Sequence, residues 1–151
     1  MGEGFDTMRK RILVTDDEPN MLSAISYVLE AAGYDVLLSD NGRQALDTIL
    51  AQQHNHQSID LLITDILMFE MSGLELIEQF RLAFPETPIL VITGFGSQGL
   101  KSQLLKRKGV GYLEKPFRPQ TLLERVDELL KGQPVAEGVP EGAGTDPEER
   151  P

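Results

Sequence analysis

The chain has 151 residues, which is enough for one domain with a buried core. Its net charge of −10 disfavours direct binding to nucleic-acid phosphates. No cysteine is present, which excludes disulfides, thiolate catalysis and Cys-ligated metals, and fits the reducing cytoplasm. No apolar run reaches the length of a membrane span, and the run after the N-terminal basic residues is too short for a signal peptide. We therefore expect a cytoplasmic protein without membrane or nucleic-acid contact.

The composition divides the chain into three segments. Residues 1–8 are predicted to be a disordered leader, and residues 9–131 carry all of the apolar periodicity. Residues 132–151 hold four glycines, four prolines, five acids and one arginine, and they lack any apolar period. Such a segment cannot bury enough apolar surface to fold, so we expect a disordered acidic tail. Contact of the tail with a partner remains the alternative to a solvated end.

Short apolar runs punctuate the central segment at residues 12–14, 36–38, 61–63, 89–92 and 112–113. They are continuous rather than alternating, which is typical of strands covered on both faces. Amphipathic helical patterns are predicted between and after them, at residues 21–32, 45–50, 74–84, 100–105 (the weakest) and 122–130. Gly33, Pro85 and Gly109 mark the ends of three of these helices. The pattern predicts an α/β domain, a doubly wound five-stranded parallel sheet with helices on both faces.

Polar residues follow four of the five predicted strands. Asp16, Asp17 and Glu18 follow the first, Asp65 follows the third, Thr93 the fourth and Lys115 the fifth. Open parallel sheets bind ligands outside the carboxyl ends of their strands, so these side chains are expected to converge. A carboxylate at the end of a buried strand costs free energy unless a cation pairs with it.

The chemistry of such a cluster points to phosphoryl transfer. Several carboxylates at close range need a cation, and their hard oxygens suit Mg²⁺. A carboxylate beside Mg²⁺ can attack phosphorus and become an acyl phosphate. Asp65 is then the nucleophile, Asp16 and Asp17 hold the metal, and Lys115 and Thr93 hold the phosphoryl oxygens. Each residue alone has a simpler interpretation as a cap, turn or loop residue, and the prediction rests on their combination.

The motifs ILVTDDEPN, LLITDILMFEMSG, PILVITGFGS and GYLEKPF resemble those of the receiver domain of two-component response regulators. The resemblance covers about residues 9–131. The intervals of 48 residues from Asp17 to Asp65, 28 from Asp65 to Thr93 and 22 from Thr93 to Lys115 are similar to the family's. The resemblance implies the flavodoxin-like form of the doubly wound fold that the pattern of strands and helices predicts.

The resemblance implies a role for each matching position. It makes Asp65 the phosphoacceptor and Asp16 and Asp17 the acidic pair that binds Mg²⁺, for which Mn²⁺ could substitute. The backbone carbonyl of Leu67 would complete the metal ligands, and Lys115 would pair with the phosphate.

Three further features follow from the same resemblance. Thr93 would be the hydroxyl that moves toward the phosphate, and Tyr112 the aromatic residue that swings inward with it. The Lys115–Pro116 bond is expected to be cis, as X-Pro bonds can be.

The resemblance also implies partners and a mode of action. A sensor histidine kinase or a phosphotransfer protein would donate the phosphoryl group in a two-component phosphorelay. A downstream protein would bind the face formed by residues 100–108, 112–113 and 122–130, and phosphorylation-linked homodimerisation is possible in this family. The basic run Lys106–Arg107–Lys108 on that face either favours a helix C-terminus or meets an acidic partner. The protein would not be a turnover enzyme on an external substrate.

One departure from the family lies in the loop after Asp65, where Phe69 stands in place of the usual proline. Phe frees φ and restores an N–H, so the loop is expected to be less constrained. Leu67 and Phe95 place apolar groups beside the site, and we expect them to slow hydrolysis of the phosphoryl group.

Two rival functions are weaker. A Mg²⁺-dependent phosphohydrolase would generally carry a second Asp two residues after its nucleophile, where this chain has Leu67. A flavodoxin-like cofactor binder would need glycines or hydroxyls in its first strand-to-helix loop, and TDDEPN repels phosphate instead.

Overall fold

The computed structural model describes residues 9–68, 71–94, 102–103 and 106–132. Its elements are, in chain order, β1 (Arg11–Thr15), α2 (Pro19–Ala31), β2 (Asp35–Ser39), α3 (Gly42–His54), β3 (Leu61–Asp65), α4 (Gly73–Ala83), β4 (Ile89–Thr93), β5 (Val110–Glu114) and α6 (Pro119–Leu130). All five predicted strands and four of the five predicted helices are confirmed. Most of the predicted helix at 100–105, the leader 1–8 and nearly all of the tail 132–151 lie outside the described residues.

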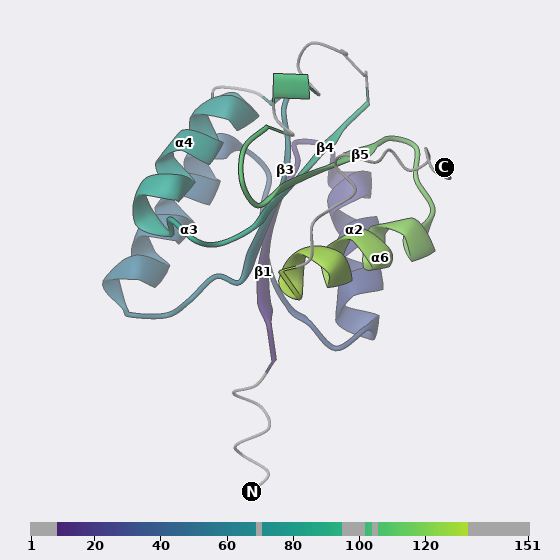
Figure 1. Ribbon diagram of the computed structural model, residues 1–151, viewed down its shortest axis with the longest axis horizontal. Helices are drawn as coiled ribbons and strands as arrows, with labels where there is room; N and C mark the ends of the chain where they lie inside the picture. Colours follow the sequence, from purple (N-terminus) through teal and green to yellow (C-terminus); the bar gives the residue numbers. More distant parts are fainter. Residues whose placement is uncertain (1–8, 69–70, 95–101, 104–105, 133–151) are drawn as a thin grey trace, which may run out of the picture.

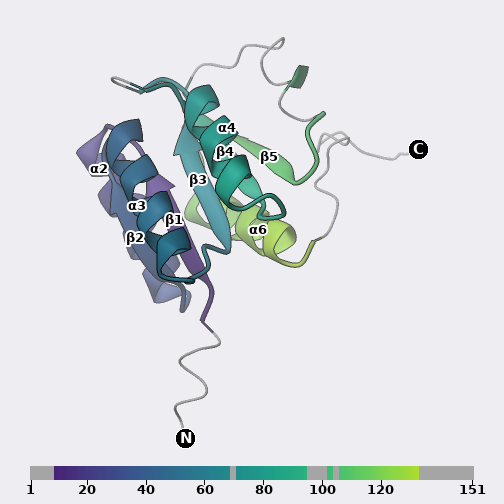
Figure 2. The same cartoon turned by 90° about the vertical axis from the view of Figure 1, so that its left-hand side faces the viewer.

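The strands form one parallel sheet in the order β2-β1-β3-β4-β5. Helices α3 and α4 cover one face of the sheet, and α2 and α6 cover the other (Figures 1 and 2). The predicted doubly wound architecture is therefore confirmed. The strand order reverses at β1 and β3, and in open α/β sheets this is where ligand sites form. None of the described helices is long and apolar enough to cross a bilayer.

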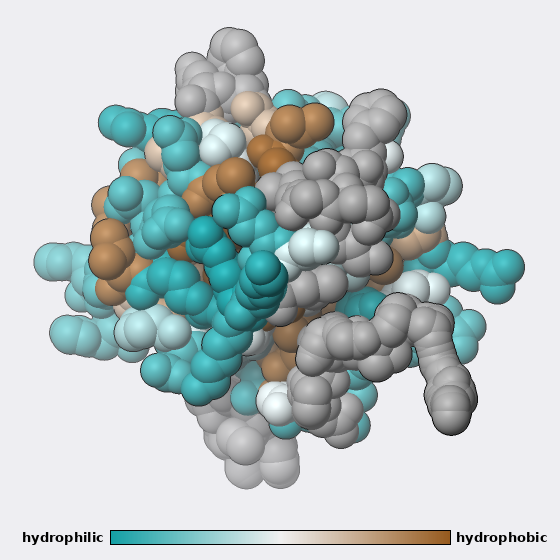
Figure 3. All heavy atoms as spheres, turned by 45° about the horizontal axis from the view of Figure 1, so that its top comes forward, coloured by the Kyte–Doolittle hydropathy of each residue, from teal (hydrophilic) through white to brown (hydrophobic). Residues whose placement is uncertain are grey.

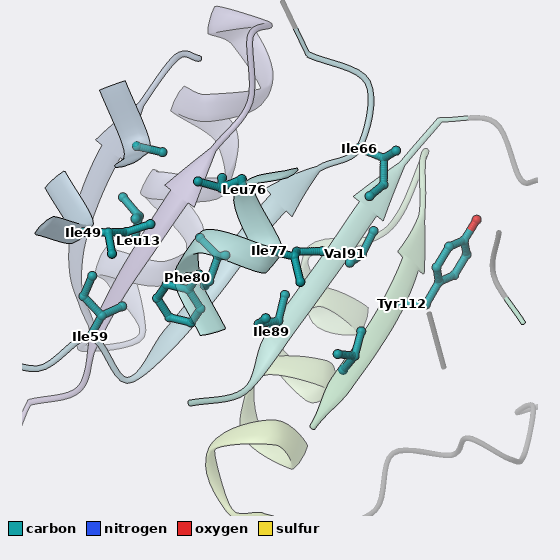
Figure 4. Close-up of a cluster of buried hydrophobic side chains, with 13 residues drawn as sticks. Leu13, Ile49, Ile59, Ile66, Leu76, Ile77, Phe80, Ile89, Val91 and Tyr112 are labelled. Carbon is teal, nitrogen blue, oxygen red and sulfur yellow. The ribbon is translucent and has the colours of Figure 1, made fainter. Parts of the chain in front are cut away.

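The core has two halves because successive residues of a strand point to opposite faces of the sheet. Leu13, Leu62 and Val91 point toward α3 and α4, where Phe80 fills the middle of the first cluster (Figure 4). Their strand neighbours point toward α2 and α6 and form the second cluster, which contains Ile12, Val14, Leu61, Ile63, Leu90 and Ile92. Double coverage explains why β1, β3 and β4 read as continuous apolar runs.

Strand β2 departs from that expectation because it lies at the edge of the sheet. Leu38 is 45% exposed, although the apolar run at 36–38 predicted a strand buried on both faces. Leu50 of α3, expected on the apolar face of its helix, is likewise half exposed. An edge strand has a neighbour on one side alone, so its helices cover it incompletely.

Candidate functional site

The carboxyl ends of four strands bring the predicted residues to one edge of the sheet. The register aligns Thr15 with Thr64 and Asp65 with Ile92, so β1, β3 and β4 finish level with one another. Thr93 ends β4 and lies opposite Glu114 of β5, immediately before Lys115. The convergence predicted from the sequence is therefore confirmed, and it arises from parallel pairing in register.

Three carboxylates form the centre of this site. Asp16, Asp17 and Asp65 each place one carboxylate oxygen within 4.8 Å of the other two. Asp16 is 2% exposed and Asp65 is 7% exposed, whereas Asp17 lies at the surface. A set of hard oxygen donors with one open side matches what Mg²⁺ requires, since this ion keeps several waters and takes few carboxylates.

Lys115 is the cation that faces these carboxylates. Its Nζ lies 3.0 Å from Asp16 Oδ2 and 3.0 Å from Asp65 Oδ2, and 3.9 Å from Glu18 Oε1. Burial alone lowers the pKa of this ammonium, but the hydrogen bonds and charges of Asp65 and Asp16 outweigh burial and leave the pKa raised. Lys115 therefore stays charged, and it bridges β1 and β3 across 99 and 50 residues of sequence.

The backbone of Lys115 is held as firmly as its side chain. Its N–H donates to the carbonyl oxygen of Thr93 at 2.9 Å, which continues the pairing of β4 with β5 beyond the strands. The Lys115–Pro116 peptide bond is cis, as the family resemblance implied.

The surroundings of Asp16 disfavour the ionised form of its carboxyl group. Burial raises its pKa, and the Glu18 backbone N–H at 2.9 Å and the Lys115 ammonium only partly oppose this effect. The charge of Asp65 adds to the rise. In the absence of a metal, two carboxylates thus share one lysine, and the site is short of positive charge.

The residues on either side of Asp65 form hydrogen bonds with it. The Leu67 N–H donates to Asp65 Oδ1 at 3.2 Å, which orients the carboxylate and leaves Oδ2 toward Lys115. Thr64 Oγ1 donates to the Asp65 carbonyl at 2.8 Å. Leu67 is 64% exposed, and Figure 3, which looks onto this end of the molecule, shows apolar patches among hydrophilic ones. Phe69 and Phe95, singled out in the sequence, lie outside the described residues.

Thr93 and Tyr112 occupy the places that the sequence predicts. Thr93 is buried at the end of β4. Tyr112 lies on β5 in register with Val91, and its ring sits at the β5 margin of the first core cluster (Figure 4). Burial and then the charge of Glu114 raise the pKa of the Tyr112 hydroxyl, so this residue is uncharged at neutral pH.

A second layer of polar contacts beneath Asp16 was not predicted. Thr15 Oγ1 and Ser39 Oγ are buried and lie 2.9 Å apart, and the Asp16 N–H donates to the Ser39 carbonyl at 3.2 Å. The signal was available, because Ser39 is a polar residue directly after the second apolar run, as Asp65 is after the third. It was missed because the predicted site drew only on the first, third, fourth and fifth strands.

The basic run at 106–108 is partly engaged with α4. Arg107 Nη1 lies 3.2 Å from Glu78 Oε2, and Arg81 Nη2 donates to the Lys108 carbonyl at 2.9 Å. Lys106 and Lys108 are exposed, and contact of the run with an acidic partner stays a prediction.

The fold and the site define a class of protein: doubly wound α/β domains with an acidic cluster, bridged by a lysine, at the point where the strand order reverses. The comparisons with known proteins narrow this class. Residues 12–127 match the model of the response regulator receiver domain, and the chain belongs to that family.

Individual relatives agree with this assignment. The chain is 31% identical over 129 residues to the alkaline phosphatase synthesis transcriptional regulatory protein PhoP of Bacillus subtilis, and covers 52% of it. It is 33% identical over 121 residues to the response regulator receiver protein CpdR of Brucella abortus, and covers 97% of it. Of the other curated relatives that it matches most strongly, the chain spans about half the length.

Solved structures show the same fold. A CheY-like response regulator receiver domain protein from Methanospirillum hungatei superposes with a TM-score of 0.71 at 31% identity, covering 82% of this chain and 94% of that one. A receiver domain from Clostridium thermocellum gives the same TM-score at 29% identity, with 81% and 94% covered.

The unfavourable burial of the Asp16 charge leads to a first prediction. Asp16→Asn should raise the free energy of unfolding of the metal-free protein by about 1 kcal/mol, because it removes a poorly compensated buried charge. The asparagine oxygen can still accept from the Glu18 N–H. Since the pKa of Asp16 is raised in the folded state, the gain should be full near neutral pH and should shrink as the pH falls through that pKa. Urea unfolding with a chelator, at neutral and at acidic pH, measures both effects.

The same measurement with Mg²⁺ in place of the chelator provides the control. Mg²⁺ should stabilise the wild type and have little effect on Asp16→Asn. The difference between their free energies of unfolding should therefore shrink or change sign. A variant that is less stable than the wild type in chelator would contradict the argument.

Proposed function

We propose that this receiver domain accepts a phosphoryl group on Asp65, in a Mg²⁺-dependent reaction, from the phosphohistidine of a sensor kinase or a phosphotransfer protein. The observation that carries the proposal is the position of Asp65 Oδ2, 3.0 Å from the Lys115 ammonium and within reach of two further carboxylates. A nucleophile, a site for a metal and a permanent cation thus meet at one point. This is the combination that phosphoryl transfer needs.

The reaction follows from the contacts of Asp65. The Leu67 N–H holds Oδ1, so Oδ2, which faces Lys115, is the oxygen that would form a bond to phosphorus while the P–N bond of the phosphohistidine breaks. The electron pair of that bond leaves with the imidazole of the donor. Lys115 can transfer its hydrogen bond from Asp65 to a phosphoryl oxygen without leaving Asp16. The Thr93 hydroxyl, at the end of the neighbouring strand, would donate to another.

The metal would be held by Asp16, Asp17, Asp65 and the Leu67 backbone carbonyl, as in the family. When bound, Mg²⁺, or Mn²⁺ in its place, supplies positive charge to the equatorial phosphoryl oxygens. The shortage of positive charge around Asp16 supports this assignment, since the lysine alone leaves the pKa of Asp16 raised.

The output would be a population shift between two conformations. Thr93 and Tyr112 lie on adjacent strands, so a movement of the first toward the phosphate can be followed by the second. The surface around β5 and α6 would change with them and bind a downstream protein or a second copy of the chain. The protein is then a switch in a cytoplasmic phosphorelay and no turnover enzyme.

The test is phosphorylation by a small-molecule phosphodonor, with and without Mg²⁺, read by intact mass. We expect the gain of one phosphoryl group with Mg²⁺ and almost none in chelator. Peptide mapping should place the group on Asp65, and alkaline lability should identify it as an acyl phosphate.

Two results would contradict the proposal. A mass that never changes would leave the acidic cluster without phosphoryl chemistry and the chain as an unphosphorylated binding module. Steady release of product from a phosphate monoester would favour the phosphohydrolase, against which the apolar Leu67 argues.

A further inference from the structure

The start of α3 touches the loop that follows Asp65. Gly42 is the first residue of α3, and a Cβ built on it would lie 2.6 Å from Met71 Cβ and 2.9 Å from the Met71 carbonyl oxygen. Real Cβ atoms essentially never approach other atoms this closely, so only glycine permits the contact. The backbone at the start of α3 is therefore packed against the Met71 side chain, and Figure 2 shows α3 and α4 as neighbours on one face of the sheet.

The α3 side of the contact is fixed by its own hydrogen bonds. The Gln44 N–H donates to the Asn41 side chain at 2.7 Å, and the Asp40 N–H donates to Gln44 Oε1 at 2.7 Å. These two bonds cap the helix and hold Gly42 between them. The helix start cannot retreat from Met71 without losing its cap.

The loop side is fixed too, immediately after Met71. Ser72 and Glu75 form a reciprocal capping box at the start of α4, with bonds of 3.1 and 3.2 Å. Met71 is partly buried and packs against the first core cluster. A larger residue at position 42 would thus displace Met71, which stands two residues before Gly73, the residue whose N–H binds the Ile66 carbonyl.

That loop carries the contacts that shape the candidate metal site. At its start, the Leu67 N–H donates to Asp65 Oδ1, and the Ile66 carbonyl accepts from the Gly73 N–H at 2.9 Å. Ile66 and Leu67 therefore stand between Asp65 and the end pinned by Met71. A shift of the loop would first move the Leu67 carbonyl, the proposed backbone ligand.

We propose that Gly42 is a positioning residue for metal binding, which acts through Met71 on the loop that holds Asp65 and the Leu67 carbonyl. This inference rests on the proposed function, and it assigns a role in that site to a residue on a different loop, following the edge strand β2. Gly42 touches neither the metal nor the phosphoryl group.

The test is Mg²⁺ affinity of the full chain, measured by isothermal titration calorimetry, for Gly42→Ala. We expect roughly ten-fold weaker binding, the loss typical when a group that orients metal ligands is disturbed. Phosphorylation by a small-molecule donor should return close to the wild-type rate at saturating Mg²⁺, because the reacting groups remain. Arg43→Ala, an exposed change one residue along the same helix, is the matched control and should bind as the wild type does.

A reciprocal exchange separates this role from a merely structural one. Met71→Gly removes the Cβ and Cγ that the new alanine would meet and leaves the carbonyl oxygen at 2.9 Å. Gly42→Ala should therefore lose less Mg²⁺ affinity in the Met71→Gly background, relative to Met71→Gly alone, than it loses in the wild-type background. If Gly42→Ala unfolds, this double variant carries the test. Equal losses in both backgrounds would overturn the inference, as would an unchanged affinity in Gly42→Ala. Failure of the wild type to bind Mg²⁺ would instead refute the proposed function.

Discussion

Asp65→Asn should abolish phosphorylation by small-molecule donors while leaving the fold intact. The asparagine oxygen can still accept from the Leu67 N–H, but the amide is a far weaker nucleophile than the carboxylate. Lys115 keeps Asp16 as a partner, so no cation is left buried alone. Intact mass after incubation with donor and Mg²⁺ should show no added phosphoryl group under conditions that fully modify the wild type.

Asp60→Asn provides the matched control for that experiment. Asp60 directly precedes β3 and Asp65 is the last residue of the same strand, so the two carboxyl groups lie at opposite ends of the sheet. The Asp60 carboxylate accepts from the Arg11 N–H at 2.8 Å, and it should tolerate the change to an amide oxygen. Full phosphorylation of Asp65→Asn would show that Asp65 is not the acceptor, and no phosphorylation of Asp60→Asn would show that the loss in Asp65→Asn is not specific to that position.

Lys115→Met should separate metal binding from phosphoryl transfer. The lysine neutralises Asp16 and Asp65 in the metal-free protein, so its removal should tighten Mg²⁺ binding while it slows phosphorylation roughly a hundred- to a thousand-fold. Stability in chelator should fall by about 3 kcal/mol, because two buried carboxylates lose their partner. Calorimetric titration, the rate of mass gain and urea unfolding measure the three effects.

The pH dependence of that stability loss has a definite sign. The pKa of Lys115 is raised in the folded state, so its stabilisation is fully present at neutral pH and is lost only as the pH rises through that pKa. Wild type and variant should therefore converge in strongly alkaline solution. Lys131→Met, which removes an exposed ion pair with Asp127, is the control and should change stability by less than about 1 kcal/mol. Weaker Mg²⁺ binding in Lys115→Met would contradict the competition between lysine and metal.

In the metal-free protein, the buried carboxylates that would serve phosphorylation lower the stability of the fold. Asp16 and Asp65 are buried beside one lysine, which leaves the pKa of Asp16 raised despite two favourable contacts. The same shortage of positive charge would give Mg²⁺ its affinity and the phosphoryl group its place. Stability and phosphorylation should therefore respond in opposite directions to Asp16→Asn.

Most of the candidate site could be predicted because its residues follow strands directly. Asp16, Asp65, Thr93 and Lys115 each stand one or two positions after an apolar run, and parallel pairing carries such positions to one edge. Position relative to a strand is a local property, and the sequence displays it. The contributions of Ser39 and Gly42 were missed, because Ser39 ends the edge strand β2 and Gly42 follows it, and only the packing reveals that α3 reaches the Asp65 loop.

The sequence determines the order of strands and helices, the doubly wound class and the identities of the acidic and basic groups, because hydrophobic period and residue type are local properties. The distances between the side chains of the site do not follow from the sequence. Three features depend on how separate elements pack. Lys115 lies equally close to Asp16 and Asp65, and burial outweighs the effect of Lys115 on the pKa of Asp16. Leu38 is left exposed at the sheet edge. Desolvation and close contact are properties of the assembled neighbours, so they emerge only when the chain has folded.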